Sequence, residues 1–229
     1  MAEVVLIVGV GAGLSASLAR RFARDGGRIV LAARTPEKLQ RLAAETKAVV
    51  LRCDATVRAD VEALFAACEA GPGAPDVVIY NPSGRVRGPF VELDPDAVKQ
   101  AIEVAAYGGF LVAQAAAKRM LVKGGGTILF TGASASVKGY PMSAPFAMGK
   151  FALRGLAQSL ARELQPQNIH VAHFVIDGGI RSAERTAAAG QPDSLLDPDA
   201  IADSYFHVAR QARSAWTSEV ELRPWVERF

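Results

Sequence analysis

The sequence is poor in the residues from which disulfide frameworks and metal centres are built. Among its 229 residues only Cys53 and Cys68 are cysteines, too few for a disulfide scaffold. The histidines are His170, His173 and His207, and none has a cysteine or acidic neighbour at the spacing of a metal site. We therefore expect buried free thiols, His170 and His173 packed in or beside a strand, and no bound metal.

An excess of one charge is also missing. The 26 lysines and arginines nearly balance the 23 aspartates and glutamates, and the two signs are interspersed. This balance gives no basis for nucleic acid or a membrane surface as a partner. The first apolar run, Val4–Val8, is too short to span a membrane and leads into glycines, where a signal peptide would stay apolar. We expect a cytoplasmic protein.

What the sequence does contain is a regular alternation of strand and helix patterns. Half of its residues are hydrophobic, and its length fits one domain over residues 1–229. Strands are predicted at Val4–Val8, Ile29–Ala33, Val49–Arg52, Asp76–Tyr80, Thr127–Thr131 and His170–Ile176. Helices are predicted at Leu14–Asp25, Pro36–Glu45, Arg58–Glu69, Asp96–Leu121 and Ala144–Leu164. Apolar strands alternating with helices predict an α/β fold, a doubly wound parallel sheet in a single domain.

Three local features complete this organisation. Thr35 stands before Pro36, where it can cap the second helix. Residues Arg181–Pro198 have no strong period, so we expect a mobile loop over the site. The tail from Ser218 alternates like a short last strand, in which Trp225 is expected to pack.

The first strand runs directly into a glycine-rich turn. Gly9, Gly11 and Gly13 are followed by Leu14 and Ser15, which open a helix. Glycine lets the backbone approach a pyrophosphate, and the helix N-terminus supplies free N–H donors. A purely structural strand-to-helix turn is the alternative, but the complete strand–turn–helix order favours nucleotide binding.

The end of the second strand indicates which nucleotide. NAD-specific proteins carry an acidic residue there for the ribose diol, whereas this chain has Arg34. A guanidinium can bind a 2′-phosphate through charge-assisted hydrogen bonds, and Lys38 is placed to assist. NADP (NADPH) is therefore favoured and NAD is less favoured; a solvated arginine is the alternative.

Further motifs extend this pattern along the chain. Val8, Gly9, Gly13 and Ser15 align with a Thr-Gly-x-x-x-Gly-x-Gly turn, and Phe146-x-x-x-Lys150 aligns with a Tyr-x-x-x-Lys helix. Together they resemble the short-chain dehydrogenase/reductase family, whose NAD(P)-binding domain has the Rossmann fold. The resemblance implies an oxidoreductase that transfers a hydride between the nicotinamide and a small carbonyl or alcohol.

The resemblance assigns cofactor contacts to further residues. Asp54, at the end of the third strand, inherits a hydrogen bond to the adenine ring; a helix-capping aspartate is the alternative. Asn81, Ser83 and Gly84 match an Asn-Asn-Ala-Gly turn that packs against the adenosine half. A loop that holds the nicotinamide corresponds to Gly178, Ile180 and Ser182, and Lys150 would bind the nicotinamide ribose.

The family's proton-handling residues are mostly replaced. Phe146 holds the tyrosine position, Ala133 the serine position and Ala105 the asparagine position, while Lys150 is retained. A phenyl ring cannot transfer a proton, and loss of a general acid typically costs about 10²–10⁴ in rate. The catalytic set expected from the resemblance is therefore Lys150 with Phe146 at the tyrosine position.

Other residues could supply the missing proton. Ser134 follows the serine position, and Tyr140 lies ten residues before Lys150 in a loop that could fold over the pocket. Ser143 and Tyr107 are further candidates, and a desolvated Lys150 could act alone because burial lowers a lysine pKa. A structural role is the alternative for each.

Two functions therefore stay open. One is an NADP(H)-dependent oxidoreductase with an atypical site and a small-molecule substrate. The other is a non-catalytic NADP(H)-binding sensor or partner subunit, which retains the cofactor residues and lacks the acid–base set. The resemblance further implies a homodimer or homotetramer that forms through the helices Asp96–Leu121 and Ala144–Leu164.

Overall fold

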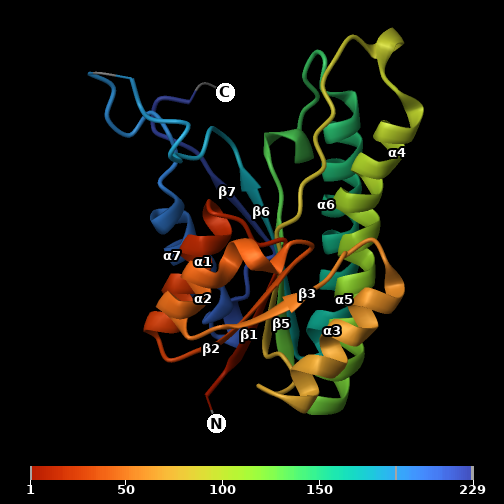
Figure 1. Cartoon of the computed structure of the whole chain (residues 1–229), viewed down its shortest axis with the longest axis vertical. Helices are drawn as coiled ribbons and strands as arrows, with labels where there is room; N and C mark the ends of the chain where they lie inside the picture. Colours follow the sequence, from red (N-terminus) through yellow and green to blue (C-terminus); the bar gives the residue numbers. More distant parts are fainter. Residues whose placement is uncertain (1, 189, 228–229) are drawn as a thin grey trace.

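The computed structural model describes residues 2–188 and 190–227 and shows a parallel sheet between two layers of helices (Figure 1). The sheet has seven strands in the order β3-β2-β1-β4-β5-β6-β7. They are β1 (Val4–Val8), β2 (Arg28–Ala33), β3 (Val49–Arg52), β4 (Val77–Tyr80), β5 (Gly126–Thr131), β6 (Ile169–Ile176) and β7 (Glu219–Leu222). Every neighbouring pair is parallel, which confirms the predicted doubly wound sheet.

Helices cover both faces of the sheet. One layer holds α1 (Leu14–Arg24), α2 (Gln40–Thr46) and α7 (Pro198–Ala209), and the other holds α3 (Arg58–Ala70), α4 (Pro95–Ile102), α5 (Gly108–Lys123) and α6 (Ala144–Leu164) (Figure 1). Short helical turns lie at η1 (Pro36–Leu39), η2 (Phe90–Glu92), η4 (Ser134–Ser136), η5 (Gln165–Gln167) and η6 (Arg213–Ala215).

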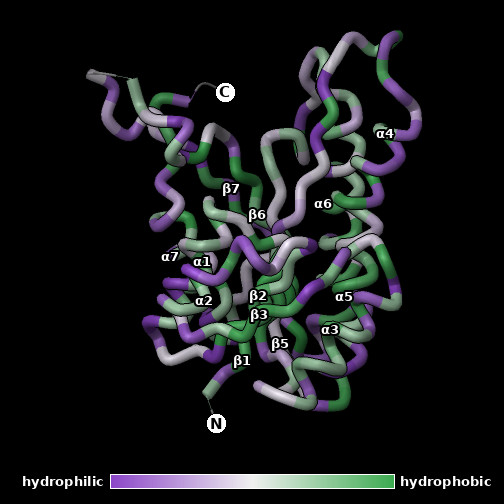
Figure 2. The backbone as a smooth tube through the Cα atoms, viewed as in Figure 1, coloured by the Kyte–Doolittle hydropathy of each residue, from purple (hydrophilic) through white to green (hydrophobic). Residues whose placement is uncertain are grey.

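Successive strand residues face opposite layers and build two apolar cores. Leu6 and Val8 pack toward α3, α5 and α6, whereas Val5 and Ile7 pack toward α1 and α7. This double burial explains why the strands read as continuous apolar runs. Figure 2 shows the hydrophobic colouring concentrated along the strands in the middle of the molecule.

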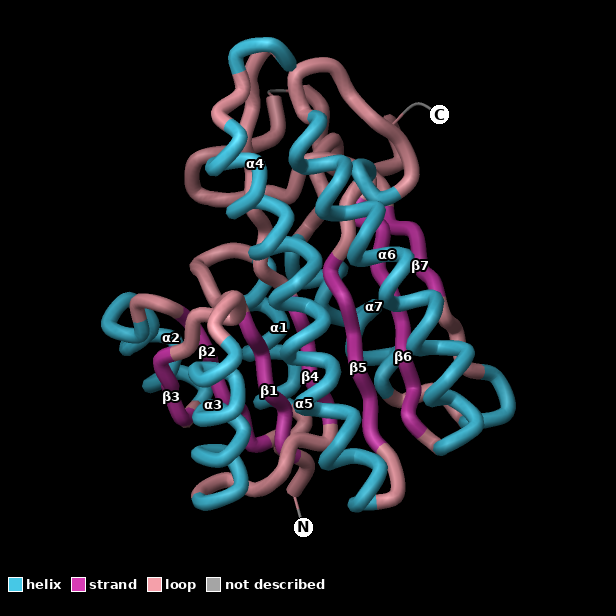
Figure 3. The backbone as a smooth tube through the Cα atoms, turned by 90° about the vertical axis from the view of Figure 1, so that its right-hand side faces the viewer, coloured by secondary structure: helices cyan, strands magenta, loops and turns pink. Residues whose placement is uncertain are grey.

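The order of the strands determines where a ligand can bind. The chain runs outward from β1 through β2 to β3 and then returns to β4, on the other side of β1. In such sheets a crevice opens at the carboxyl ends of the strands where the order reverses. Figure 3 shows the strands side by side, with long loops extending beyond one end of the sheet.

The structure departs from the predicted elements at four points. The helix expected over 96–121 is interrupted by a π-helical turn, η3 (Glu103–Tyr107). Thr35 makes no side-chain cap, because the segment begins as the 3₁₀ turn η1. Helix α7 was not predicted, although the Asp197 carboxylate caps it. Trp225 does not pack, since it is 80% exposed.

Several predictions about single side chains are confirmed. Cys53 and Cys68 are free and buried, and His170 and His173 are buried on β6. The predicted last strand corresponds to β7. Within the described ranges, no helix is both long and apolar enough to cross a bilayer.

Candidate active site

The glycine-rich turn between β1 and α1 is conformationally specialised. Gly9 has a φ of +81°, and a β-carbon there would lie 2.6 Å from the Pro82 ring. Only glycine fits this position without strain. A β-carbon at Gly11 or Gly13 would meet nothing within 4 Å, so these two residues leave open space beside the turn.

Side-chain hydrogen bonds of Ser15 and Asn81 hold this turn in place. The Ser15 hydroxyl donates to the Gly9 carbonyl at 3.1 Å and accepts from the Asn81 amide at 2.6 Å. The sequence places Ser15 in the turn that is predicted to bind the nucleotide. The structure instead buries Ser15 and uses its hydroxyl inside the turn, where it ties β1 to the end of β4.

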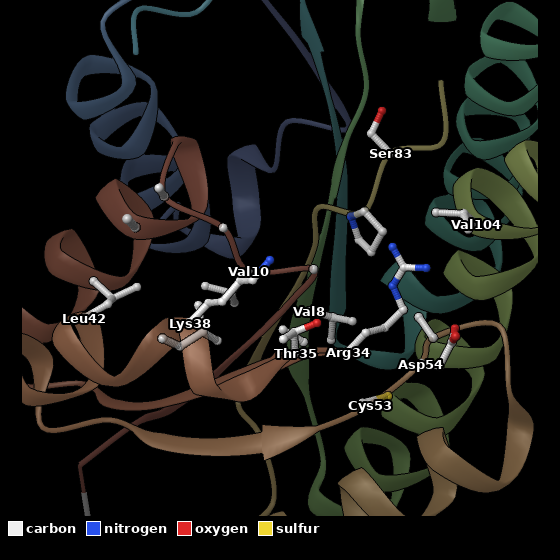
Figure 4. A pocket seen from close by; sticks show the side chains of 18 of the residues that line it. Val8, Val10, Arg34, Thr35, Lys38, Leu42, Cys53, Asp54, Ser83 and Val104 are labelled. Atoms are coloured by element: carbon white, nitrogen blue, oxygen red, sulfur yellow. The ribbon is translucent and has the colours of Figure 1, made fainter. Parts of the chain in front are cut away.

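A cavity of about 640 Å³ lies beside the turn and is lined by five of the fourteen predicted cofactor residues. It is lined by Gly9, Gly11, Arg34, Asp54 and Ser83, and also by Lys38 from η1. Arg34 follows β2 and Asp54 follows β3, and Figure 4 shows their side chains close together at one end of the cavity.

The charges in this cavity suit a phosphorylated nucleoside. Partial burial alone would raise the pKa of Asp54, but hydrogen bonds from the backbone and hydroxyl of Thr56, together with Arg34, lower it. Asp54 is therefore an acceptor that stays ionised. Arg34 and Lys38 provide positive charge for a phosphate, and the open glycine turn fits a pyrophosphate.

A second cavity, of about 290 Å³, lies at the carboxyl ends of β4, β5 and β6. The predicted residues that line it come from four separate segments. They are Gly13, Leu14, Asn81, Ser83, Phe146, Lys150, Gly178, Ile180 and Ser182. Ser83 lines both cavities, and the glycine turn contributes residues to each, so the two adjoin as one continuous site.

Lys150 is the buried cation of this second cavity. Its side chain is 2% exposed, and Nζ donates to the carbonyl oxygens of Thr131 at 2.7 Å and Pro82 at 3.4 Å. Burial, with a smaller contribution from the charge of Arg85, lowers the pKa of Lys150 to about 7. Lys150 is therefore not a solvent-exposed helix lysine.

The structure does not bring the two proposed replacement hydroxyls to the cavity. Ser134 opens η4 and lies outside the residues that line either cavity, whereas its neighbour Ala133 is among them. Tyr140 is 44% exposed and lies near Lys138, also outside both linings. Neither residue is therefore among those that line the cavity together with Lys150.

Gly84 and Ala105 act through packing. A β-carbon at Gly84 would lie 2.7 Å from the Ala101 Cα, so this glycine lets the turn after β4 lie against α4. Ala105 is fully buried in η3, and a β-carbon at Gly149 would lie 2.6 Å from its Cβ. No room remains at Ala105 for the asparagine that the resemblance leads us to expect.

The sequence reasoning missed three arginines around Phe146. The Arg85 guanidinium carbon lies 4.4 Å from the centroid of the Phe146 ring, and Arg181 and Arg185 line the same cavity. Arg85 follows a motif that ends at Gly84, and the other two lie in a loop without periodicity. The only available signal was the number of arginines close together at 85–87 and 181–185.

Comparisons with known proteins agree with this geometry. The family model described as short chain dehydrogenase matches residues 3–191. An uncharacterized oxidoreductase of Staphylococcus aureus is 26% identical, covering 97% of this chain and 97% of its own length.

Solved structures give the same result. The crystal structure of a short-chain dehydrogenase from Rhodopseudomonas palustris is 35% identical, with a TM-score of 0.84, covering 97% of this chain and 99% of that one. A metagenomic short-chain oxidoreductase in complex with NADP is 27% identical, with a TM-score of 0.85, and the match covers 98% of both chains.

Proposed function

The chain belongs to the short-chain dehydrogenase family, and we propose that it is an NADPH-dependent oxidoreductase acting on a small carbonyl compound or the corresponding alcohol. The observation that carries the proposal is the continuous site. Arg34 and Lys38 stand in one cavity, the buried Lys150 stands in the next, and the glycine turn lies between them.

The chain's own residues divide the work of binding. In the larger cavity we assign the 2′-phosphate to Arg34 and Lys38 and the adenine to Asp54. We assign the pyrophosphate to the turn from Gly9 to Leu14. The nicotinamide end is assigned to Lys150 and the loop around Ile180 in the second cavity. The metagenomic short-chain oxidoreductase that is 27% identical was solved in complex with NADP, which supports the preference for NADP. When bound, NADPH supplies the hydride that reduces a carbonyl carbon.

The proton that must reach the carbonyl oxygen needs a source other than residue 146. Phe146 and Ala133 line the cavity without a hydroxyl. Lys150 has a pKa of about 7, so its ammonium can release a proton near neutral pH. We assign the proton to Lys150, which solvent reprotonates after turnover.

Purified wild type, Lys150→Met and Phe146→Tyr test the proposal. NADPH binding is followed by fluorescence, and NADPH oxidation is followed with a panel of aldehydes and ketones. We expect NADPH to bind wild type, at least one carbonyl to be reduced, and Lys150→Met to be inactive. Phe146→Tyr should be at least as active as wild type, because it adds the family's acid in a half-buried position.

The non-catalytic alternative predicts a different result. NADPH would bind tightly to wild type without oxidation by any carbonyl of the panel. Turnover would then appear only when Phe146→Tyr is combined with Ala133→Ser. A cytoplasmic location and a homodimer or homotetramer complete the proposal, by analogy with the family.

A further inference from the structure

Every charged residue described in the lining of the second cavity is positive. Its charged lining residues are Arg85, Lys150, Arg181 and Arg185, and no aspartate or glutamate is among the described residues that line it. Such a cavity attracts an anion, since low-dielectric walls strengthen the field of like charges that line them.

Two of these cations already have partners. Arg181 forms an ion pair with Asp197 at 2.6 Å, and Lys150 donates to two backbone carbonyls. Arg85 and Arg185 have no ion-pair partner among residues 2–188 and 190–227. Arg85 and Arg185 are both exposed residues, and partial desolvation with the charges of Arg185 and Arg87 lowers the pKa of Arg85, so these guanidinium groups lie near one another.

Phe146 gives Arg85 a defined position. The guanidinium lies over the face of the phenyl ring, which is a favourable cation–π arrangement. Phe146 lies in the first turn of the helix that carries Lys150 one turn later, and the stacked guanidinium lines the same cavity as the lysine and lowers its pKa. The residue that replaces the family's tyrosine is in this chain a platform for an arginine.

The dinucleotide's own phosphates are the competing ligand for Arg85. Arg85 does not line the larger cavity, which holds Arg34 and Lys38, and its ring contact is with Phe146 in the first turn of α6. Gly13 and Leu14 of the glycine turn line the same second cavity as Arg85, so the affinity for NADP⁺ is the control that separates the two ligands. The planar fork of a guanidinium matches a carboxylate with two parallel hydrogen bonds.

We infer that the substrate carries a carboxylate in addition to its carbonyl group, and that Arg85, positioned by Phe146 and assisted by Arg185, binds it. This inference rests on the proposed function, because the carboxylate is expected to hold the carbonyl beside Lys150. It names a substrate class, the oxo acids, and makes Arg85 its specificity-determining residue.

Binding alone tests the carboxylate site. Protein saturated with NADP⁺ is titrated in a calorimeter with straight-chain carboxylates from propanoate to octanoate and with the amides of equal length. We expect at least one carboxylate to bind at least 10-fold more tightly than its amide. Arg85→Gln should weaken that carboxylate roughly 10- to 100-fold, as expected when hydrogen bonds to a charged group are lost.

Matched variants separate this role from others. Arg87→Gln removes a charge from the same loop outside the cavity lining and should bind the carboxylate like wild type. Phe146→Tyr keeps the aromatic platform and should retain affinity, whereas Phe146→Leu removes it and should lose several-fold. The inference would be overturned if no carboxylate bound more tightly than its amide. It would also be overturned if Arg85→Gln lowered the affinity for NADP⁺.

A turnover measurement distinguishes failure of the inference from failure of the proposed function. The protein is given NADPH with 4-oxopentanoate or with 2-pentanone. Equal reduction of the two by wild type and Arg85→Gln would leave an oxidoreductase without a carboxylate site. Carboxylate binding through Arg85 with no reduction of either would leave the site in place and contradict the proposed function.

Discussion

Phe146 stands where the resemblance places the family's proton donor. In the structure Ala105 is enclosed against Gly149, and Arg85 lies over the phenyl ring. The absence of a hydroxyl could be read from the sequence. The stacked arginine could not, because the contact joins residues 61 positions apart and belongs to no motif.

At Lys150 the account predicts a pH dependence of stability. In the cofactor-free protein, the free energy of unfolding of wild type should rise relative to Lys150→Met between about pH 7 and pH 10. An unfolded lysine has a pKa of about 10.4 and keeps its proton in this window. The folded residue, with a pKa of about 7, has lost it.

The sign follows from proton binding. Because the unfolded state holds more protons in this window, stability rises with pH, by at most about 1.4 kcal/mol per pH unit. Urea titrations of the two proteins at pH 7, 8, 9 and 10 measure the difference. A difference that stays constant over this range would show that Lys150 keeps its charge when folded.

At Arg34 the account predicts the choice of cofactor. Arg34→Asp should weaken NADPH binding roughly 10- to 100-fold, because charge-assisted hydrogen bonds to a phosphate are lost. NADH binding should be unchanged or tighter, since an acidic residue can accept from the ribose diol. Arg41→Asp makes the same charge change at the rim of the same cavity and should have a smaller effect. Unchanged affinities of Arg34→Asp for both cofactors would reject the assignment.

At the scale of elements, the contact between α6 and η3 depends on Gly149. Gly149→Ala should destabilise the protein by about 1–3 kcal/mol, since its methyl group would press on Ala105. Gly155→Ala is the control in the same helix, where a β-carbon meets nothing within 4 Å. It should stabilise by about 0.5–1 kcal/mol through helix propensity. Thermal unfolding of both variants compares them, and equal shifts would contradict the packing argument.

The strands were the most predictable elements. The apolar runs of β1 to β6 are long enough to specify buried parallel strands, and these six strands begin and end within one residue of the predicted bounds. The π-helical turn at Glu103–Tyr107 was not predictable, because no local pattern marks it; its contact, Ala105 on Gly149, joins residues far apart in the sequence. Helix α7 was overlooked because its cap, Asp197, lies at the end of a stretch without periodicity.

At the scale of the whole molecule, one helical layer keeps an apolar outer face. Tyr107 and Phe110 from η3 and α5, and Met148 and Phe151 from α6, are all at least 41% exposed. We predict that the protein elutes as a dimer or tetramer, with the mass of the assembly measured by light scattering. Phe151→Asp should lower the mass of the assembly. Val91→Asp, at the exposed turn η2, should leave the mass unchanged. A monomeric wild type would contradict the prediction.

The account as a whole rests on hydride transfer at a site without the usual acid, and isotope transfer measures this directly. NADPH deuterated at the transferable position of the nicotinamide is incubated with wild type and 4-oxopentanoate, and the product is examined by mass spectrometry. We predict a 4-hydroxypentanoate one mass unit heavier, formed by wild type and lost in Lys150→Met. Tight binding of NADPH with no deuterium in the product, and none in a wider panel of oxo acids and ketones, would contradict the account.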